Sequence, residues 1–260
     1  MTDSILVARD GALARVTFNR PAFLNAMDFE MGRRWRDVAH EITSDASVGA
    51  VILDAAGPAF CAGGDVIAMA TSGASGADVT DTAHIIHDGI RTFALSDKPI
   101  VAAVQGAVAG GGLGLMLTAD YIVAADSAKF VSKYANIGLT PDLGVSTLLP
   151  AAIGQRRALQ LLLQDRTLDA GTALDWGLVS EVVPRDDVAG RAEAVARFWL
   201  AGATAAFGQA KRLVRVGADR TFDENLADEA PSIGARFDTD EARTRVAAFA
   251  AASAKQARPA

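Results

Sequence analysis

The chain has 260 residues, with 25 Lys and Arg against 31 Asp and Glu, which gives a formal net charge of −6. A protein that binds nucleic acid needs a dense basic surface to neutralise phosphates, and the cluster Arg33 to Arg36 is short and has acidic neighbours. Nucleic acid is therefore not expected as a partner. Half of the residues are apolar and 22% are charged, which is typical of one large globular unit rather than a disordered chain.

The location expected from the sequence is the cytoplasm. Cys61 is the only cysteine, so it cannot form an internal disulfide, and the first residues lack the basic start and apolar run of a signal peptide. The stretch between Lys98 and Asp120 carries no charge and is long enough to cross a bilayer. Its several glycines and Pro99 would make a poor continuous helix, so we expect no membrane partner. The stretch is instead typical of a buried strand, a turn and the start of a buried helix.

The first elements follow from alternation and helical spacing. Ile5 to Val7 and Ala14 to Phe18, separated by a turn at Asp10-Gly11, predict a hairpin. Asp28 is a candidate N-cap for a helix whose apolar residues recur at helical spacing. A buried strand over Val48 to Leu53 and a loop of small residues ending at Gly64 come next.

The next segments alternate between helix and strand. Residues 71–82 show no periodicity, so this segment is expected to be irregular and mobile. Further along the chain, the pattern predicts helix over His84 to Leu95, strand over Ile100 to Val104, helix over Leu113 to Leu117 and strand over Tyr121 to Ala125. Such alternation indicates an α/β layered fold.

The character of the sequence changes after Pro184. Val188 to Val216 and Glu224 to Lys255 are rich in alanine and predict helices without strands. We therefore expect residues 1–190 to form a β/α core and residues 191–260 to form a helical C-terminal region.

Two glycine-rich loops share one design, in which a buried strand leads through small residues into a helix. They are Phe60 to Asp65 and Gly110 to Gly114. Glycine lets a ligand approach the backbone, and the free amides at a helix N-terminus carry partial positive charge. Two such ends that converge would bind an oxyanion, although each loop alone also fits tight helix-strand packing. Neither loop matches the glycine motifs that bind phosphate.

These loops and several other stretches make the sequence resemble the enoyl-CoA hydratase/isomerase, or crotonase, superfamily. The matching stretches are Asn19 to Pro21 with Asn25-Ala26, Phe60 to Asp65, Lys98 to Gly114, Asp126 to Phe130, Ile137 to Pro150 and Trp176 to Pro184. The resemblance implies a β-spiral core, a C-terminal helical region that forms trimers or hexamers, and an acyl-CoA thioester as substrate. It implies no cofactor other than the coenzyme A of that substrate.

The resemblance also assigns roles to individual residues. The oxyanion-hole amides would be those of Gly64 and Gly111, which would hold the thioester oxygen as it becomes an enolate. The residues implied to border coenzyme A are Phe23, Leu24, Ala26, Ala62 and Asp65.

The reaction depends on which acids lie over the acyl group. Enoyl-CoA hydratases use two glutamates, and the matching positions here are Gly114 and Tyr134, so simple hydration is not expected. Asp142 remains. Its position after Pro141 fits an N-cap of the following helix, whereas the resemblance places the catalytic aspartate of enoyl-CoA isomerases there. As an acid/base, Asp142 would move one proton and shift the double bond. Tyr134 would either donate a hydrogen bond in the pocket or only pack.

Alternatives to isomerisation stay open, and enoyl-CoA hydration is one of them despite the missing glutamates. In enzymes resembling 4-chlorobenzoyl-CoA dehalogenase, an aspartate at the position of Asp142 is the nucleophile and a histidine near the position of His87 activates water. His87 also fits an ordinary surface residue, and the chain could bind acyl-CoA without catalysis. A metal site is not expected, because His84 and His87 alone do not make a complete set of metal ligands. Cys61 is expected to be a buried small residue rather than a nucleophile.

Overall fold

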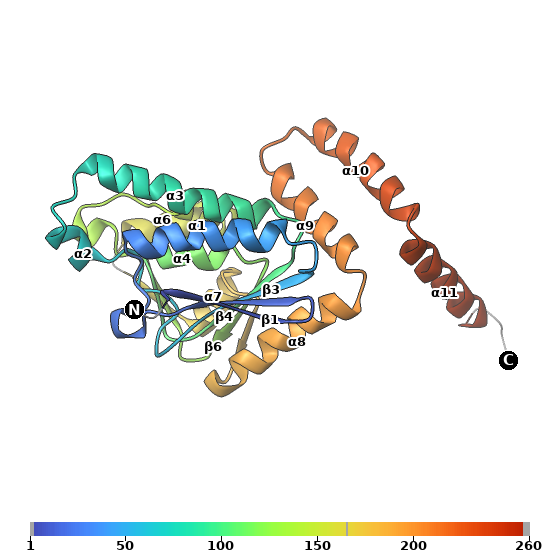
Figure 1. Cartoon of the computed structure of the whole chain (residues 1–260), viewed down its shortest axis with the longest axis horizontal. Coiled ribbons are helices and arrows are strands. Elements are labelled where there is room, and N and C mark those ends of the chain that lie inside the picture. Colours follow the sequence, from blue (N-terminus) through green and yellow to red (C-terminus); the bar gives the residue numbers. More distant parts are fainter. Residues whose placement is uncertain (1–2, 165, 257–260) are drawn as a thin grey trace.

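A six-stranded sheet organises the fold in the computed structural model, which describes residues 3–164 and 166–256 (Figure 1). Its strands, in spatial order, are β1 (Ile5–Asp10), β2 (Leu13–Phe18), β3 (Ala50–Ala55), β4 (Ile100–Val104), β6 (Tyr121–Ala125) and β9 (Glu181–Val183). β1 and β2 are antiparallel, and each later neighbour pair is parallel. A second sheet contains β5 (Ala107–Ala109), β7 (Lys129–Val131) and β8 (Thr167–Asp169). The predicted α/β class is confirmed.

The predicted hairpin is formed by β1 and β2, with Asp10 opposite Leu13. Gly11 lies in the turn at φ +57°, a conformation that glycine adopts without strain. The strand expected over Val48 to Leu53 begins two residues later, at Ala50. β4 is buried along its whole length, as expected for a central strand whose two faces are both covered.

Two long helices, α1 (Phe29–Ser44) and α3 (Gly76–Leu95), lie side by side over one face of the sheet (Figure 1). Asp28 caps α1, because its carboxylate accepts a hydrogen bond of 2.8 Å from the Met31 amide. The helices meet through Trp35 and Phe93, whose ring centroids are 5.1 Å apart. The predicted cap and the predicted apolar face of α1 are both confirmed.

The expectation of an irregular segment over residues 71–82 was wrong for residues 76–82, which are helical. α2 (Val66–Thr71) is followed after four residues by α3, which starts at Gly76. Ser75 and Asp78 form a capping box there: the Ser75 amide donates to the Asp78 carboxylate at 2.8 Å, and the Asp78 amide donates to the Ser75 hydroxyl at 3.3 Å. The cap fixes the helix start even though the first two turns have little apolar periodicity.

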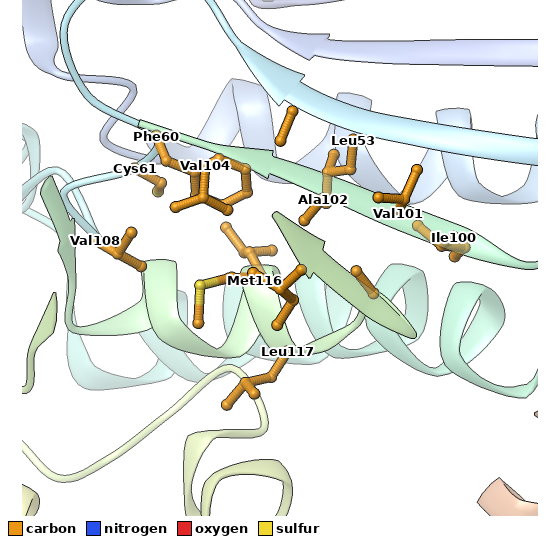
Figure 2. Close-up of a cluster of buried hydrophobic side chains, with 14 of the residues drawn as sticks. Leu53, Phe60, Cys61, Ile100, Val101, Ala102, Val104, Val108, Met116 and Leu117 are labelled. Atoms are coloured by element: carbon orange, nitrogen blue, oxygen red, sulfur yellow. The ribbon is translucent and has the colours of Figure 1, made fainter. Parts of the chain in front are cut away.

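Part of the hydrophobic core lies between the sheet and α4 (Gly111–Leu117), the helix that begins in the second glycine loop. Figure 2 shows side chains of β3, β4 and α4 meeting there, among them Leu53, Ala102 and Met116. All seven residues of α4 are buried. The helix starts two residues earlier than predicted and includes glycines of the second loop. β5, β7, β8 and β9 were not predicted as strands, because three residues are too few to show alternation.

The remaining helices follow in the second half of the chain. They are α5 (Val145–Ile153), α6 (Gln155–Leu163), α7 (Ala170–Trp176), α8 (Val188–Ala201), α9 (Thr204–Gly217), α10 (Phe222–Phe237) and α11 (Asp240–Gln256), with 3₁₀ turns at Pro21–Phe23, Ala135–Ile137 and Arg185–Asp187. The helical C-terminal region is confirmed. Across residues 3–164 and 166–256, no helix combines the length and apolarity that a bilayer crossing requires.

The expected division at residue 190 falls within α8. This helix packs against the sheet through Ala192, Val195 and Ala196, so its residues beyond 190 still belong to the packed core. By contrast, α10 and α11 extend away from the sheet as an arm (Figure 1). Every residue of α10 is at least partly exposed. The assignment of residues 191–260 to oligomerisation stays a prediction.

Candidate active site

A cavity of about 440 Å³ brings together the residues that the sequence singled out for chemistry. Its walls come from α2, α3, the two glycine loops and the segment 132–143. Gly64, Gly111, His87, Tyr134 and Asp142 all line it, although they come from four separate parts of the chain. Five predicted positions therefore share one cavity.

The two glycine loops touch each other at the floor of the cavity. The Ala109 amide donates a 3.0 Å hydrogen bond to the Cys61 carbonyl, which holds one loop along the other. A Cβ on Gly63 would lie 2.8 Å from the Ala109 carbonyl oxygen and 3.2 Å from the Gly111 nitrogen. Gly63 also has φ +96°, so a side chain there is excluded by both space and backbone conformation.

The amides of Gly64 and Gly111 are available to a ligand. Met27 pairs with the Gly64 loop through the Gly63 carbonyl and the Asp65 amide, at 2.7 and 2.9 Å, which leaves the Gly64 amide out of the pairing. Gly111 is the first residue of α4, where helix amides have no partner within the helix. Within the described part of the chain, neither amide donates a hydrogen bond.

Asp142 faces His87 rather than its own helix. One carboxylate oxygen, Oδ1, lies 2.7 Å from His87 Nε2, and the Leu143 amide donates a short hydrogen bond to the same oxygen. α5 starts at Val145, and Gly144, with φ +78°, stands before it. The interpretation of Asp142 as an N-cap is therefore wrong, because two residues and a left-handed turn separate it from the helix.

Tyr134 is buried, with 9% of its surface exposed. Its hydroxyl donates a 3.0 Å hydrogen bond to the backbone carbonyl of Asp142. Burial raises the pKa of the Tyr134 hydroxyl, so the group stays protonated and acts as a donor. Of the two interpretations made from the sequence, the structure supports a hydrogen-bond donor, directed at the backbone.

His87 lies on α3 and contributes to the cavity wall with about a third of its side chain exposed. It is thus not an ordinary surface residue. His84, one turn earlier, also lines the cavity, with its ring centroid 6.3 Å from that of His87. Over the residues described, no group of three or more His, Cys, Asp or Glu side chains has the arrangement of a metal site.

The five residues expected to border coenzyme A are not equivalent in the structure. Ala62 and Asp65 line the cavity. Phe23 and Leu24 are exposed and do not belong to its lining, and Ala26 is buried. The Asp65 carboxylate accepts from the Ala68 amide at 2.9 Å and pairs with Arg20 at 3.0 Å, so it caps α2. Their role towards coenzyme A stays a prediction.

Arg20 supports the framework of the site, and the sequence reasoning did not single it out. Its guanidinium lies 2.9 Å from Asp28 and 3.0 Å from Asp65, and it donates to the Ala26 carbonyl. The Arg20 side chain thus links Asp28, which caps α1, to Asp65, which ends the first glycine loop and caps α2. The only sequence signal for Arg20 is that it lies in Asn19 to Pro21, one of the stretches that carry the family resemblance.

Cys61, within the first glycine loop, is fully buried, as predicted. Its thiol donates to the Asn25 carbonyl at 3.2 Å, and burial raises its pKa to about 12. A thiol that stays protonated at neutral pH is a poor nucleophile, so Cys61 serves packing.

Comparisons with known proteins converge on one family. The model of the family described as enoyl-CoA hydratase/isomerase matches residues 8–256. A probable enoyl-CoA hydratase of Mycobacterium tuberculosis is 34% identical over 95% of both chains. A 4-chlorobenzoyl coenzyme A dehalogenase of an Arthrobacter species is 31% identical over 94% of this chain and 90% of its own.

One further relative and one solved structure are also similar to this chain. A 1,2-epoxyphenylacetyl-CoA isomerase of Escherichia coli is 32% identical over 87% of both chains. The crystal structure of an enoyl-CoA hydratase/isomerase from Mycobacterium abscessus superposes with a TM-score of 0.87, at 32% identity over 95% of this chain and 96% of that one. Relatives named for three different activities thus match this chain over most of its length.

Proposed function

The chain belongs to the enoyl-CoA hydratase/isomerase family, and from that premise we propose that it isomerises enoyl-CoA thioesters with Asp142 as the acid/base. The substrate would enter the cavity with its thioester carbonyl between the amides of Gly64 and Gly111. Coenzyme A would arrive as part of the substrate and would pass along Phe23, Leu24, Ala26, Ala62 and Asp65.

The observation that carries this proposal is the state of the carboxylates in the cavity. Asp28, Asp65 and Asp142 line it. Asp28 and Asp65 each cap a helix with one oxygen and pair with Arg20 through the other. Asp142 caps no helix, and both of its contacts fall on Oδ1, so Oδ2 remains for a substrate proton.

The proposed reaction needs one proton carrier and no other reagent. The Asp142 carboxylate removes a proton from C2 of a 3-enoyl thioester, and the electron pair moves to the thioester oxygen to form a dienolate. The two amides hold that negative oxygen, and such donors typically contribute about 100- to 1000-fold in rate each. The protonated Asp142 then returns the proton to C4, which leaves the double bond between C2 and C3.

Hydration fits the cavity less well. Gly114 and Tyr134 stand where the resemblance expects the two hydratase glutamates, and the Tyr134 hydroxyl is directed at the Asp142 backbone. Asp142 would therefore have to take over the tasks that the resemblance divides between two glutamates. A gain of water by a 2-enoyl thioester would contradict the isomerase proposal.

The test is a panel of 3-enoyl, 2-enoyl and 4-chlorobenzoyl thioesters of coenzyme A with the wild type and Asp142→Asn. We expect the wild type to convert the 3-enoyl thioester at constant mass, with the absorbance of the conjugated product. Asp142→Asn should lower kcat by about 100-fold or more, because the amide cannot accept the proton. Asp175→Asn, on the exposed side of α7, is the matched control, and coenzyme A binding should be unchanged in both variants.

The His87 contact favours a second candidate, hydrolytic dehalogenation. Asp142 Oδ2 would attack the ring carbon that carries chlorine, chloride would leave, and His87 would deprotonate the water that cleaves the resulting ester. This requires the imidazole to lie beside the carboxylate, as it does at 2.7 Å. Chloride release and a hydroxybenzoyl product from the 4-chlorobenzoyl thioester would establish this candidate instead.

We further propose that the arm formed by α10 and α11 makes a homotrimer or a dimer of trimers. Large apolar side chains on the arm are exposed, including Phe222, Ile233 and Phe249 at 72 to 78%. Apolar residues gathered on an arm that leaves its own core support an interface with a second copy.

A further inference from the structure

The peptide that joins Leu143 to Gly144, directly after Asp142, packs against a face of α4 that has no side chains. Gly111 and Gly114 form this face, one helical turn apart. Leu143 has φ +52°, a left-handed conformation that a branched residue adopts only when its surroundings impose it. The position of the Asp142 carboxylate therefore depends on what holds this peptide.

The Leu143 carbonyl packs against Gly114 at a distance that leaves no space for a side chain. A Cβ on Gly114 would lie 1.8 Å from the Leu143 carbonyl oxygen and 2.8 Å from the carbonyl carbon. Both atoms belong to the backbone, so no side-chain rotation could relieve the overlap. A Cβ on Gly111 would lie 2.6 Å from Leu143 Cδ1, so the leucine side chain fills the neighbouring space.

Tyr134 holds the preceding peptide unit, which joins Asp142 to Leu143. Its hydroxyl donates to the Asp142 carbonyl, while the Leu143 amide donates to the Asp142 carboxylate. The carbonyls of Asp142 and Leu143 are thus both fixed, one by a buried donor and one by close packing. With the backbone fixed at both ends, the carboxylate is directed at His87.

We propose that Gly114 is a positioning residue: by lacking a side chain it lets the Leu143 carbonyl close on α4, and this sets the Asp142 carboxylate beside His87 in the cavity. The inference rests on the proposed function, because it explains how the acid/base is held. It also makes position 114 specificity-determining. Any side chain there, a second cavity carboxylate included, excludes the observed place of Asp142, so the two arrangements are alternatives in this chain.

The test compares Gly114→Ala with Gly190→Ala, a helix glycine whose added Cβ would meet no atom within 4 Å. Each variant is assayed for kcat and KM with the substrate that the wild type converts, and for coenzyme A affinity by calorimetry. The chain has only three histidines, so nitrogen NMR of its imidazoles reports the hydrogen bond of His87 directly. Asp142→Asn supplies the signal of His87 without its carboxylate partner.

We expect Gly114→Ala to lower kcat by about 100-fold with KM and coenzyme A affinity unchanged, the loss typical of a catalytic group displaced by about 1 Å. Its His87 signal should move towards that of Asp142→Asn, and Gly190→Ala should match the wild type. An unchanged kcat and His87 signal in Gly114→Ala would overturn the proposal. If Asp142→Asn itself retained activity, the proposed function would fall instead, and the two failures are distinct.

A second variant decides the question if Gly114→Ala does not fold. In Gly114→Ala combined with Leu143→Gly, the peptide can turn away from the added methyl group, because glycine tolerates more backbone conformations. Leu143→Gly alone is the reference. The double variant should fold, bind coenzyme A and remain about 100-fold below that reference in kcat. Equal kcat in the two would contradict a positioning role for Gly114.

Discussion

At the scale of single residues, the contact that most affects the chemistry joins groups far apart in sequence. Asp142 and His87 are separated by 55 residues and meet at 2.7 Å. A histidine at this distance either orients the carboxylate or takes part in the reaction. The two roles differ in what they predict for a variant that lacks the imidazole.

His87→Ala tests this difference. Under the isomerase proposal, Asp142 alone moves the proton, so isomerisation should remain largely intact. Under the dehalogenase candidate, His87 activates water, so the variant should stop after forming the aryl ester on Asp142. Steady-state rates and the mass of the intact protein after mixing with the 4-chlorobenzoyl thioester give the answer.

The matched control for His87→Ala is His40→Ala. His40 lies on α1 and pairs with Asp88 at 2.6 Å, outside the cavity lining. It should not change either reaction. A large loss of isomerisation in His87→Ala alone would show that the histidine takes part in the proton transfer, contrary to our expectation.

At the scale of elements, ion pairs attach the C-terminal arm to the rest of the chain. Asp228 on α10 accepts from Arg212 of α9 at 2.6 and 3.0 Å and also pairs with Arg220. These two guanidinium groups hold the pKa of Asp228 well below its usual range. The carboxylate therefore stays charged in the folded protein at pH values where a free aspartate would already be protonated.

The sign of this shift predicts how the arm responds to acid. A folded-state pKa below the unfolded one stabilises the fold above the unfolded pKa, about 4 for aspartate, and the contribution is lost as pH falls through the folded pKa. Amide exchange of α10 should thus show the same protection at pH 7 and pH 5, and protection should decline below about pH 4.

Asp228→Asn should weaken the protection of α10 already at pH 7, because the charge that pairs with both arginines is gone. Asp219→Asn, on the exposed connection between α9 and α10, is the control and should resemble the wild type. Equal protection of α10 in wild type and Asp228→Asn would show that packing alone orients the arm.

At the scale of the whole molecule, the packed core and the arm differ in what covers them. The core buries its apolar residues between two sheets and their helices, whereas the arm exposes Phe222, Ile233 and Phe249. Apolar area removed from water contributes about 25 cal/mol per Å², so these side chains would stabilise an assembly in which they are covered.

The expected mass in solution by sedimentation equilibrium is therefore three or six times that of one chain. Phe222→Asp combined with Ile233→Asp should shift the mass towards that of one chain, because burying two new carboxylates in an apolar interface is unfavourable. Leu6→Asp, at an exposed position of β1, is the control. A wild type that sediments as a single chain would contradict the oligomer proposal.

Predictability from sequence varied with the range of the interactions. α1 was predicted correctly, because Asp28 and the apolar residues after it interact within a few turns of one helix. The start of α3 was missed, since its capping box at Ser75 precedes two turns with little apolar periodicity. The short strands β5, β7, β8 and β9 exist because neighbouring strands pair with them, and no local pattern could reveal that.

By itself, the sequence determined the α/β class, the helical C-terminal region and the two glycine loops, because alternation, spacing and small residues are local properties. Only the tertiary structure decided that Asp142 faces His87 rather than capping α5. It also showed that Asp28 and Asp65 cap helices and pair with Arg20, and that Gly114 leaves space for the carbonyl of a residue far away in the sequence. These facts depend on contacts between segments far apart in the chain, which arise from packing and leave no periodic trace in the residues themselves.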